Sequence, residues 1–152
     1  MTSAGSAYLI DTNILIYAYD ARDAFKQQRA VEVMRTLQAA RLGALSVQVL
    51  GEFYVNVTRK PLVPLTIEQA RLSSVRLCRS WPVLDVTARA YLDALLGVSL
   101  YRLSFWDALV WATARDADIG NIVTEDQEHL RLVGDVRYYN PFDQQFDLSM
   151  LG

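Results

Sequence analysis

Four acidic residues stand at comparable positions in the predicted elements, and they are the residues best suited to chemistry. Asp11 follows the apolar run Tyr8–Ile10, and Asp126 closes the turn after another such run. Glu52 and Asp107 fall in the first turns of predicted helices. Converging carboxylates repel one another and cannot all ionise at neutral pH without cations. Their hard oxygen atoms suit Mg²⁺ or Mn²⁺, so together they predict a metal site that activates a water for phosphodiester hydrolysis.

Two of these acids also have ordinary structural interpretations when each is taken alone. Asp11 interrupts two apolar runs, as in a strand-to-helix turn where Thr12 or Asn13 caps the following helix. Asp107 fits a capping box with Ser104, supporting the N-terminus of its own helix. Neither interpretation requires a metal ion.

The other two acids have alternatives of the same kind. Glu52 is interpretable as a solvated helix charge paired with Arg59 or Arg41, and Asp126 as an ordinary turn acid. What favours the metal site is the joint pattern, because all four acids occupy the same topological position.

Short apolar segments alternate with helical patterns along the chain, and this alternation determines where the acids lie. The predicted strands are Tyr8–Ile10, Ala44–Ser46, Val83–Val86, Asn121–Val123 and, at most, a last short strand within Tyr138–Phe142. The predicted helices are Gln27–Arg41, Val47–Val57, Ile67–Arg79, Ala88–Leu96 and Leu103–Asp116, while Ile14–Tyr19 fits either helical turns or an extended segment. Such alternation predicts a parallel sheet with helices on both faces, where ligands bind at the carboxyl ends of the strands.

Capping residues set the expected ends of the helices. Ser46 and Thr87 are predicted N-caps, and Thr66 opens a capping box. Gly43 and Gly97 are predicted to end the helices before them.

Composition limits the class of protein. A length of 152 residues, 52% hydrophobic and 21% charged, predicts one folded domain over the whole chain. No apolar run approaches the roughly 18 residues of a membrane span, and Met1–Ala7 lacks the features of a secretory signal. Cys78 is the single cysteine and is expected to be a small buried hydrophobe. We therefore expect a cytoplasmic protein without an internal disulfide.

Charge and histidine content narrow the possible ligands. The net charge of -2 gives no overall basic field that would indicate a nucleic acid, although clustered acids mask local basic patches. His129 is the only histidine, which argues against zinc.

Four segments in this order carry a family resemblance: Leu9–Asn13, Leu45–Phe53, Leu103–Ala108 and Val123–Asp126. They resemble the motifs of PIN-domain proteins, and most of all those of the ribonuclease toxins of VapBC toxin–antitoxin pairs. The resemblance extends from about Tyr8 to Phe142. It implies a three-layer α/β/α fold with a short-stranded, mainly parallel central sheet. Residues 1–7 are then an N-terminal extension and 143–152 a C-terminal tail.

The resemblance also implies site residues and partners. It places the acids of the motifs on Asp11, Glu52, Asp107 and Asp126, with Glu125 as a competing fourth acid. The polar residues that it implies orient ligands or water are Thr12, Asn13, Ser104 and Thr124. It implies Mg²⁺- or Mn²⁺-dependent cleavage of single-stranded RNA, a homodimer, and an antitoxin that blocks the site.

Two other kinds of function stay open from the sequence. One is a catalytically silent PIN-like module that binds RNA or a protein, although such a module has no need of four mutually repelling carboxylates. The other is a DNA-directed nuclease of the same architecture. The candidate RNA contacts near the expected mouth of the site are Arg22, Lys26, Arg59 and Lys60, each of which also fits a solvated basic surface.

Overall fold

The central feature of the structure is a mixed sheet with the strand order β3-β2-β1-β4-β6-β5. The computed structural model describes residues 7–59 and 64–152, so the expectations for Lys60 and for most of the segment 1–7 lie outside the described residues. The strands are β1 (Tyr8–Ile10), β2 (Gly43–Ser46), β3 (Val83–Leu84), β4 (Asn121–Val123), β5 (Leu132–Val133) and β6 (Val136–Tyr139). All neighbouring pairs are parallel except β5 and β6. This confirms the predicted α/β class with its mainly parallel sheet.

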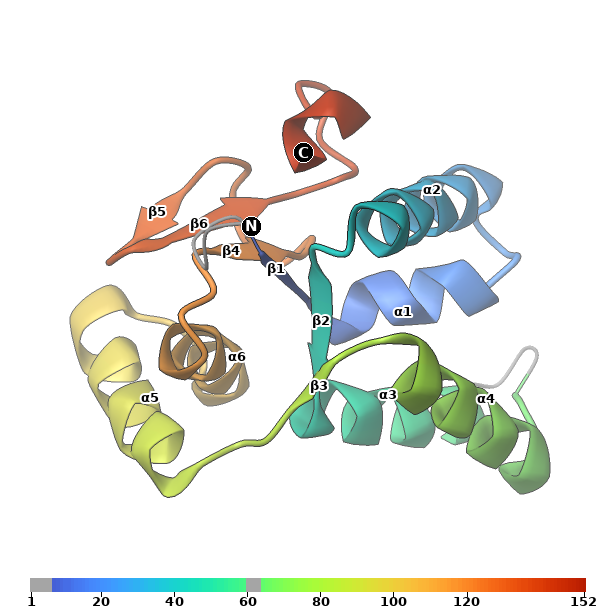
Figure 1. Cartoon of the computed structure of the whole chain (residues 1–152), viewed down its shortest axis with the longest axis horizontal. Coiled ribbons are helices and arrows are strands. Elements are labelled where there is room, and N and C mark those ends of the chain that lie inside the picture. Colours follow the sequence, from blue (N-terminus) through green and yellow to red (C-terminus); the bar gives the residue numbers. More distant parts are fainter. Residues whose placement is uncertain (1–6, 60–63) are drawn as a thin grey trace.

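Helices cover both faces of the sheet. They are α1 (Thr12–Tyr19), α2 (Ala24–Ala40), α3 (Val47–Arg59), α4 (Ile67–Ser80), α5 (Ala88–Tyr101), α6 (Phe105–Asp116) and the short 3₁₀ helix η2 (Leu148–Leu151). In Figure 1, α5 and α6 lie on one side of the sheet and α1 and α2 on the other, with α3 and α4 alongside. The segment Ile14–Tyr19, which the sequence left as either helical turns or an extended segment, is helical and belongs to α1. Among the described residues, no helix combines the length and the apolar character needed to span a membrane.

The predicted N-caps are confirmed. Thr66 forms a complete capping box with Gln69, and the Thr87 hydroxyl accepts a hydrogen bond from the backbone N–H of Ala90. The Ser46 hydroxyl accepts one from the N–H of Val49, 3.2 Å away. These bonds satisfy N–H groups that a helix start leaves without partners.

Both predicted glycine stops are wrong. Helix α2 ends at Ala40 and is capped by Arg41, which adopts the left-handed conformation with φ of 56°, and Gly43 is already in β2. Helix α5 continues past Gly97 to Tyr101. A Cβ atom at Gly97 would lie 2.9 Å from the ring of Trp111, so this glycine lets α5 approach α6 closely.

Cys78 is exposed, which corrects its predicted burial. Helix α4 buries Ala70, Ser73 and Leu77, which recur at helical spacing. Cys78 follows Leu77 and is therefore rotated about 100° away from the buried stripe.

The C-terminal region differs most from expectation. The last strand is Val136–Tyr139 rather than a segment reaching Phe142, and its hairpin partner β5 was not predicted because two residues carry no periodic signal. The tail docks on the core: Leu151 is fully buried, η2 packs against α2, and the Tyr8 hydroxyl donates to the carbonyl of Met150.

Candidate metal and active site

The register of β1 and β4 brings the first and last acidic motifs together. Ile10 pairs with Val123, so the residues that leave the two strands emerge side by side at the carboxyl edge of the sheet. The Asp11 N–H donates to the carbonyl of Val123 at 3.0 Å, which extends the pairing by one residue. Two segments 113 residues apart therefore present Asp11 and Thr124 at the same point.

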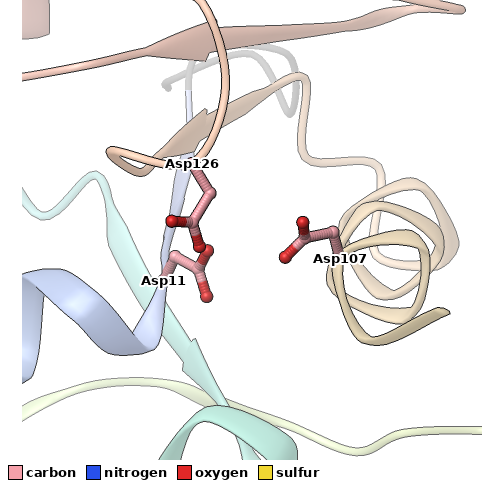
Figure 2. A group of neighbouring side chains, drawn as sticks. All are labelled: Asp11, Asp107 and Asp126. Atoms are coloured by element: carbon pink, nitrogen blue, oxygen red, sulfur yellow. The ribbon is translucent and has the colours of Figure 1, made fainter. Parts of the chain in front are cut away.

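Three of the four predicted acids form one cluster. Asp11, Asp107 and Asp126 each offer a carboxylate oxygen, and these atoms all lie within 4.8 Å of one another. In Figure 2, Asp11 and Asp126 are adjacent, and Asp107 points toward them from α6. We call these three residues the acidic trio.

A polar network fixes the orientation of the trio. The Thr124 hydroxyl donates to Asp11 Oδ2 at 2.8 Å and accepts hydrogen bonds from Asn13 Nδ2 and from the N–H of Asp126. The same Asn13 amide also donates to Asp126 Oδ2 at 3.2 Å, and the Thr12 N–H donates to Asp11 Oδ1. The hydroxyl of Thr124 thus uses its donor and both acceptor sites within the network.

Burial and mutual repulsion make the trio receptive to protons. Asp11 is only 7% exposed, and its pKa is raised from 3.8 to about 7, mainly by burial and in smaller part by the charges of Asp126 and Asp107, against the lowering effect of its hydrogen bonds. Partial desolvation and then the charge of Asp107 raise the pKa of Asp126. Such perturbation is typical of functional sites.

Glu52 lies in the same pocket but is not part of the trio. The pocket has a volume of about 170 Å³. Its lining residues are Asp11, Thr12, Asn13, Ile16, Gln48, Glu52, Asn56, Trp106, Asp107, Val110 and Asp126. The Thr12 hydroxyl donates to Glu52 Oε2 at 3.2 Å and Gln48 Nε2 donates to Glu52 Oε1 at 2.7 Å. Among the described residues Glu52 has no ion pair, so neither Arg41 nor Arg59 neutralises it.

The competing acid, Glu125, is turned away from the trio. Its Oε1 accepts a hydrogen bond from the Tyr17 hydroxyl at 2.6 Å, and its Oε2 forms an ion pair with Lys26 at 2.9 Å. The Lys26 ammonium group also lies over the rings of Tyr17 and Phe142. We call Tyr17, Lys26 and Glu125 the Lys26 clamp.

The structure also locates the remaining predicted site residues. Ser104 is the N-cap of α6 and accepts a hydrogen bond from the Asp107 N–H at 3.3 Å, which is the capping role weighed from the sequence. The Asp107 side chain points toward Asp11 and Asp126. The sequence reasoning missed Gln48, although its position four residues before Glu52 places both on one helix face.

The donor set of the trio fits Mg²⁺ or Mn²⁺. Mg²⁺ holds oxygen ligands at 2.0–2.1 Å, so ligands on opposite sides of one ion are about 4.2 Å apart, slightly closer than the spread within the trio. Within residues 7–59 and 64–152, no lysine, arginine or histidine forms an ion pair with any of the three carboxylates. Three converging carboxylates without a cationic partner are a fitting site for a divalent cation.

The protein is thus an α/β protein with a mainly parallel sheet and an acidic pocket at the carboxyl edge of that sheet. A family model described as PIN domain matches residues 8–135, and the chain therefore belongs to the PIN domain family. A search of curated protein sequences finds no significant match.

Several solved structures share the fold. One is a toxin–antitoxin complex from Klebsiella pneumoniae, with a TM-score of 0.64 and 18% identity over 90% of this chain and 99% of that chain. The Sarcin–Ricin loop cleaving toxin VapC20 of Mycobacterium tuberculosis gives 0.60 and 24% identity over 76% and 87%. VapBC2 of Rickettsia felis, solved with a DNA fragment from its promoter, gives 0.62 and 17% identity over 88% and 98%.

Proposed function

We propose that this protein is a Mg²⁺- or Mn²⁺-dependent endoribonuclease acting on single-stranded RNA, and the toxin of a type II toxin–antitoxin pair. The observation that carries the proposal is the acidic trio, in which three carboxylates from three separate motifs converge in one pocket. Membership of the PIN domain family and the shared fold with proteins described as toxins support it. Its place of action is then the cytoplasm, where its RNA substrate and antitoxin are made.

The four acids and their hydrogen-bond partners have proposed roles. Asp11, Asp107 and Asp126 hold the ion, and Glu52 completes the site from α3, held by Thr12 and Gln48. Asn13 and Thr124 keep the carboxylates of the trio oriented through the hydrogen bonds described above. A bound divalent ion lowers the pKa of a water and stabilises charge on the phosphate.

The candidate RNA contacts differ in whether their charges are already paired within the chain. Arg22 is bound to Asp20 through Nε at 2.8 Å, and Lys26 is engaged by Glu125, so both charges have intramolecular partners. Arg59 is exposed in the last turn of α3 and remains a candidate for a phosphate contact.

We further propose two protein partners. A second copy of the chain covers the outward face of α5, whose exposed apolar side chains are Tyr91, Leu92, Leu95, Leu96, Val98 and Leu100. An antitoxin segment places an arginine against the trio, since carboxylates without a cationic partner offer bidentate acceptors for a guanidinium group. The aromatic content supports the dimer only in part, because Trp81 and Trp111 are buried in the core and Trp106 is exposed.

The proposal is tested with end-labelled single-stranded RNA and DNA of the same sequence, incubated with Mn²⁺ or with EDTA. We expect cleavage of the RNA in Mn²⁺ and none in EDTA. Asp11→Asn should reduce the rate at least 100-fold because it removes a ligand charge, whereas Asp143→Asn, at a residue that does not line the pocket, should cleave like the wild type. Cleavage that persists in EDTA would contradict the metal mechanism, and preference for the DNA strand would contradict the substrate.

A further inference from the structure

A buried tyrosine within electrostatic reach of Asp107 and Asp11 has a hydroxyl group without a hydrogen-bond partner among the described residues. Tyr138 in β6 is 2% exposed, and its hydroxyl has no hydrogen-bond partner among the described residues. Buried hydroxyl groups are nearly always paired, because leaving one unpaired costs the free energy of its lost hydration. An unpaired one therefore needs an explanation, and core packing alone would be served equally well by phenylalanine.

The position of Tyr138 supplies that explanation. It pairs with Ile122 of β4, two residues before Thr124, where the chain enters the acidic pocket. The next residue, Tyr139, packs its ring against Tyr8 and His129. Because side chains alternate along a strand, Tyr138 faces the opposite side of the sheet, where α6 packs against β6 and carries Asp107.

The electrostatic surroundings of the hydroxyl agree with this placement. After burial, the charges of Asp107 and then Asp11 are the largest influences that raise the pKa of Tyr138, while Arg131 acts in the opposite sense. The phenol therefore stays protonated, and it can donate one hydrogen bond without bringing a charge that would compete with a cation.

We propose that Tyr138 is a positioning residue of the metal site, whose hydroxyl donates to the carboxylate of Asp107 or Asp11, directly or through one water, once the trio holds a cation. The inference rests on the proposed metal-dependent function. A metal-ligating carboxylate is itself usually hydrogen-bonded, which fixes its orientation. Thr124 does this for Asp11, and no described side chain donates to Asp107, so Tyr138 provides the missing donor on that side.

The test compares Tyr138→Phe with Tyr139→Phe, which removes a hydroxyl from the opposite face of the same strand. Thermal melts in EDTA and along a Mn²⁺ titration give the stability without metal and the midpoint of metal binding. We expect Tyr138→Phe to melt in EDTA at or above the wild-type temperature, because the buried unpaired hydroxyl is gone. Its Mn²⁺ midpoint should rise roughly 10-fold, and the midpoint of Tyr139→Phe should match the wild type.

Cleavage assays separate a positioning role from a packing role. With Tyr138→Phe, cleavage at limiting Mn²⁺ should fall and recover as Mn²⁺ is raised, whereas a packing defect would not be rescued by metal. If Tyr138→Phe does not fold, Tyr138→Met gives the same comparison. An unchanged Mn²⁺ midpoint in Tyr138→Phe would overturn only the role of Tyr138. A wild type whose melting temperature does not respond to Mn²⁺ would overturn the proposed metal-dependent function as well.

Discussion

At the scale of single residues, Asp126 shows most clearly what the acidic trio costs the fold. Its carboxylate is turned toward Asp11 and shares the pocket with Asp107 (Figure 2). The charge of Asp107 helps to raise the pKa of Asp126, so the ionised trio opposes folding when no cation is bound.

Asp126→Asn should therefore stabilise the metal-free protein while destroying activity. Asparagine keeps an acceptor for the Asn13 amide and removes one of the repelling charges. Relief of about 1 kcal/mol would raise the melting temperature by roughly 2–4 °C in EDTA. Mg²⁺ should raise the melting temperature of the wild type more than that of the variant. A variant that melts below the wild type in EDTA, with equal shifts in Mg²⁺, would show that Asp126 shares no site with the other acids.

Asp11 predicts how the stability of the metal-free protein depends on pH. Its folded-state pKa of about 7 exceeds the ordinary 3.8, so the folded state binds a proton more tightly than the unfolded state between these values. The free energy of unfolding should consequently fall as pH rises from about 4 to 7 and change little above. Urea unfolding in EDTA at pH 5 and pH 8 measures this. Asp11→Asn should lose most of the difference, and an equal difference in both proteins would contradict the assignment.

At the scale of elements, the Lys26 clamp connects α1, α2 and the segment that follows β4. Tyr17 and Lys26 hold Glu125 from one side, and Asn13 Oδ1 accepts a hydrogen bond from the Glu125 N–H at 3.3 Å. Glu125 and Asp126 lie in a bend after β4, where the clamp engages Glu125 while Asp126 lines the pocket and accepts a hydrogen bond from Asn13. The clamp therefore separates the two candidate acids.

Glu125→Gln should leave most of the activity, in contrast to Asp126→Asn. The ion pair is partly exposed and is worth on the order of 1 kcal/mol or less. We expect cleavage within a few-fold of the wild type at saturating Mn²⁺, and a slightly lower melting temperature. Lys26→Met is the matched variant from the other side of the clamp and should behave alike. A loss of activity as large as that of Asp126→Asn would make Glu125 a ligand.

At the scale of the whole molecule, α5 packs against α6 through small residues and leaves its larger side chains outside. Ala90, Ala94 and Gly97 are the buried positions of the helix. Leu92, Leu96 and Leu100, spaced by four residues, are exposed by 61%, 57% and 68%. A row of exposed leucines at helical spacing is typical of a protein interface.

Leu96→Arg should separate the proposed dimer into monomers. An arginine at the centre of the apolar row adds a charge that a second copy would have to desolvate. Light scattering coupled to size-exclusion chromatography should give half the wild-type mass at the same concentration. Leu72→Arg, at an exposed leucine of α4, is the control and should leave the mass unchanged. A wild type that is monomeric at high concentration would contradict the dimer.

The sequence by itself determined the alternation of strands and helices and the four acids at its turns. Apolar period and capping residues act over a few neighbours, so they can be read locally, as at Tyr8–Ile10 and Thr66. The same local signals misplace Gly43 and Gly97, since a glycine that ends a helix looks like one that admits a neighbouring ring.

The tertiary structure alone decided which side chains meet. The choice between Glu125 and Asp126 depends on Lys26 and Tyr17, which are about a hundred residues away in the chain. The unpaired hydroxyl of Tyr138 becomes visible only when β6 lies beside β4 and packs against α6. A residue's type and spacing fix the face of the element on which it lies. Its partners depend on strand order and register, which are determined by contacts between segments far apart in the chain.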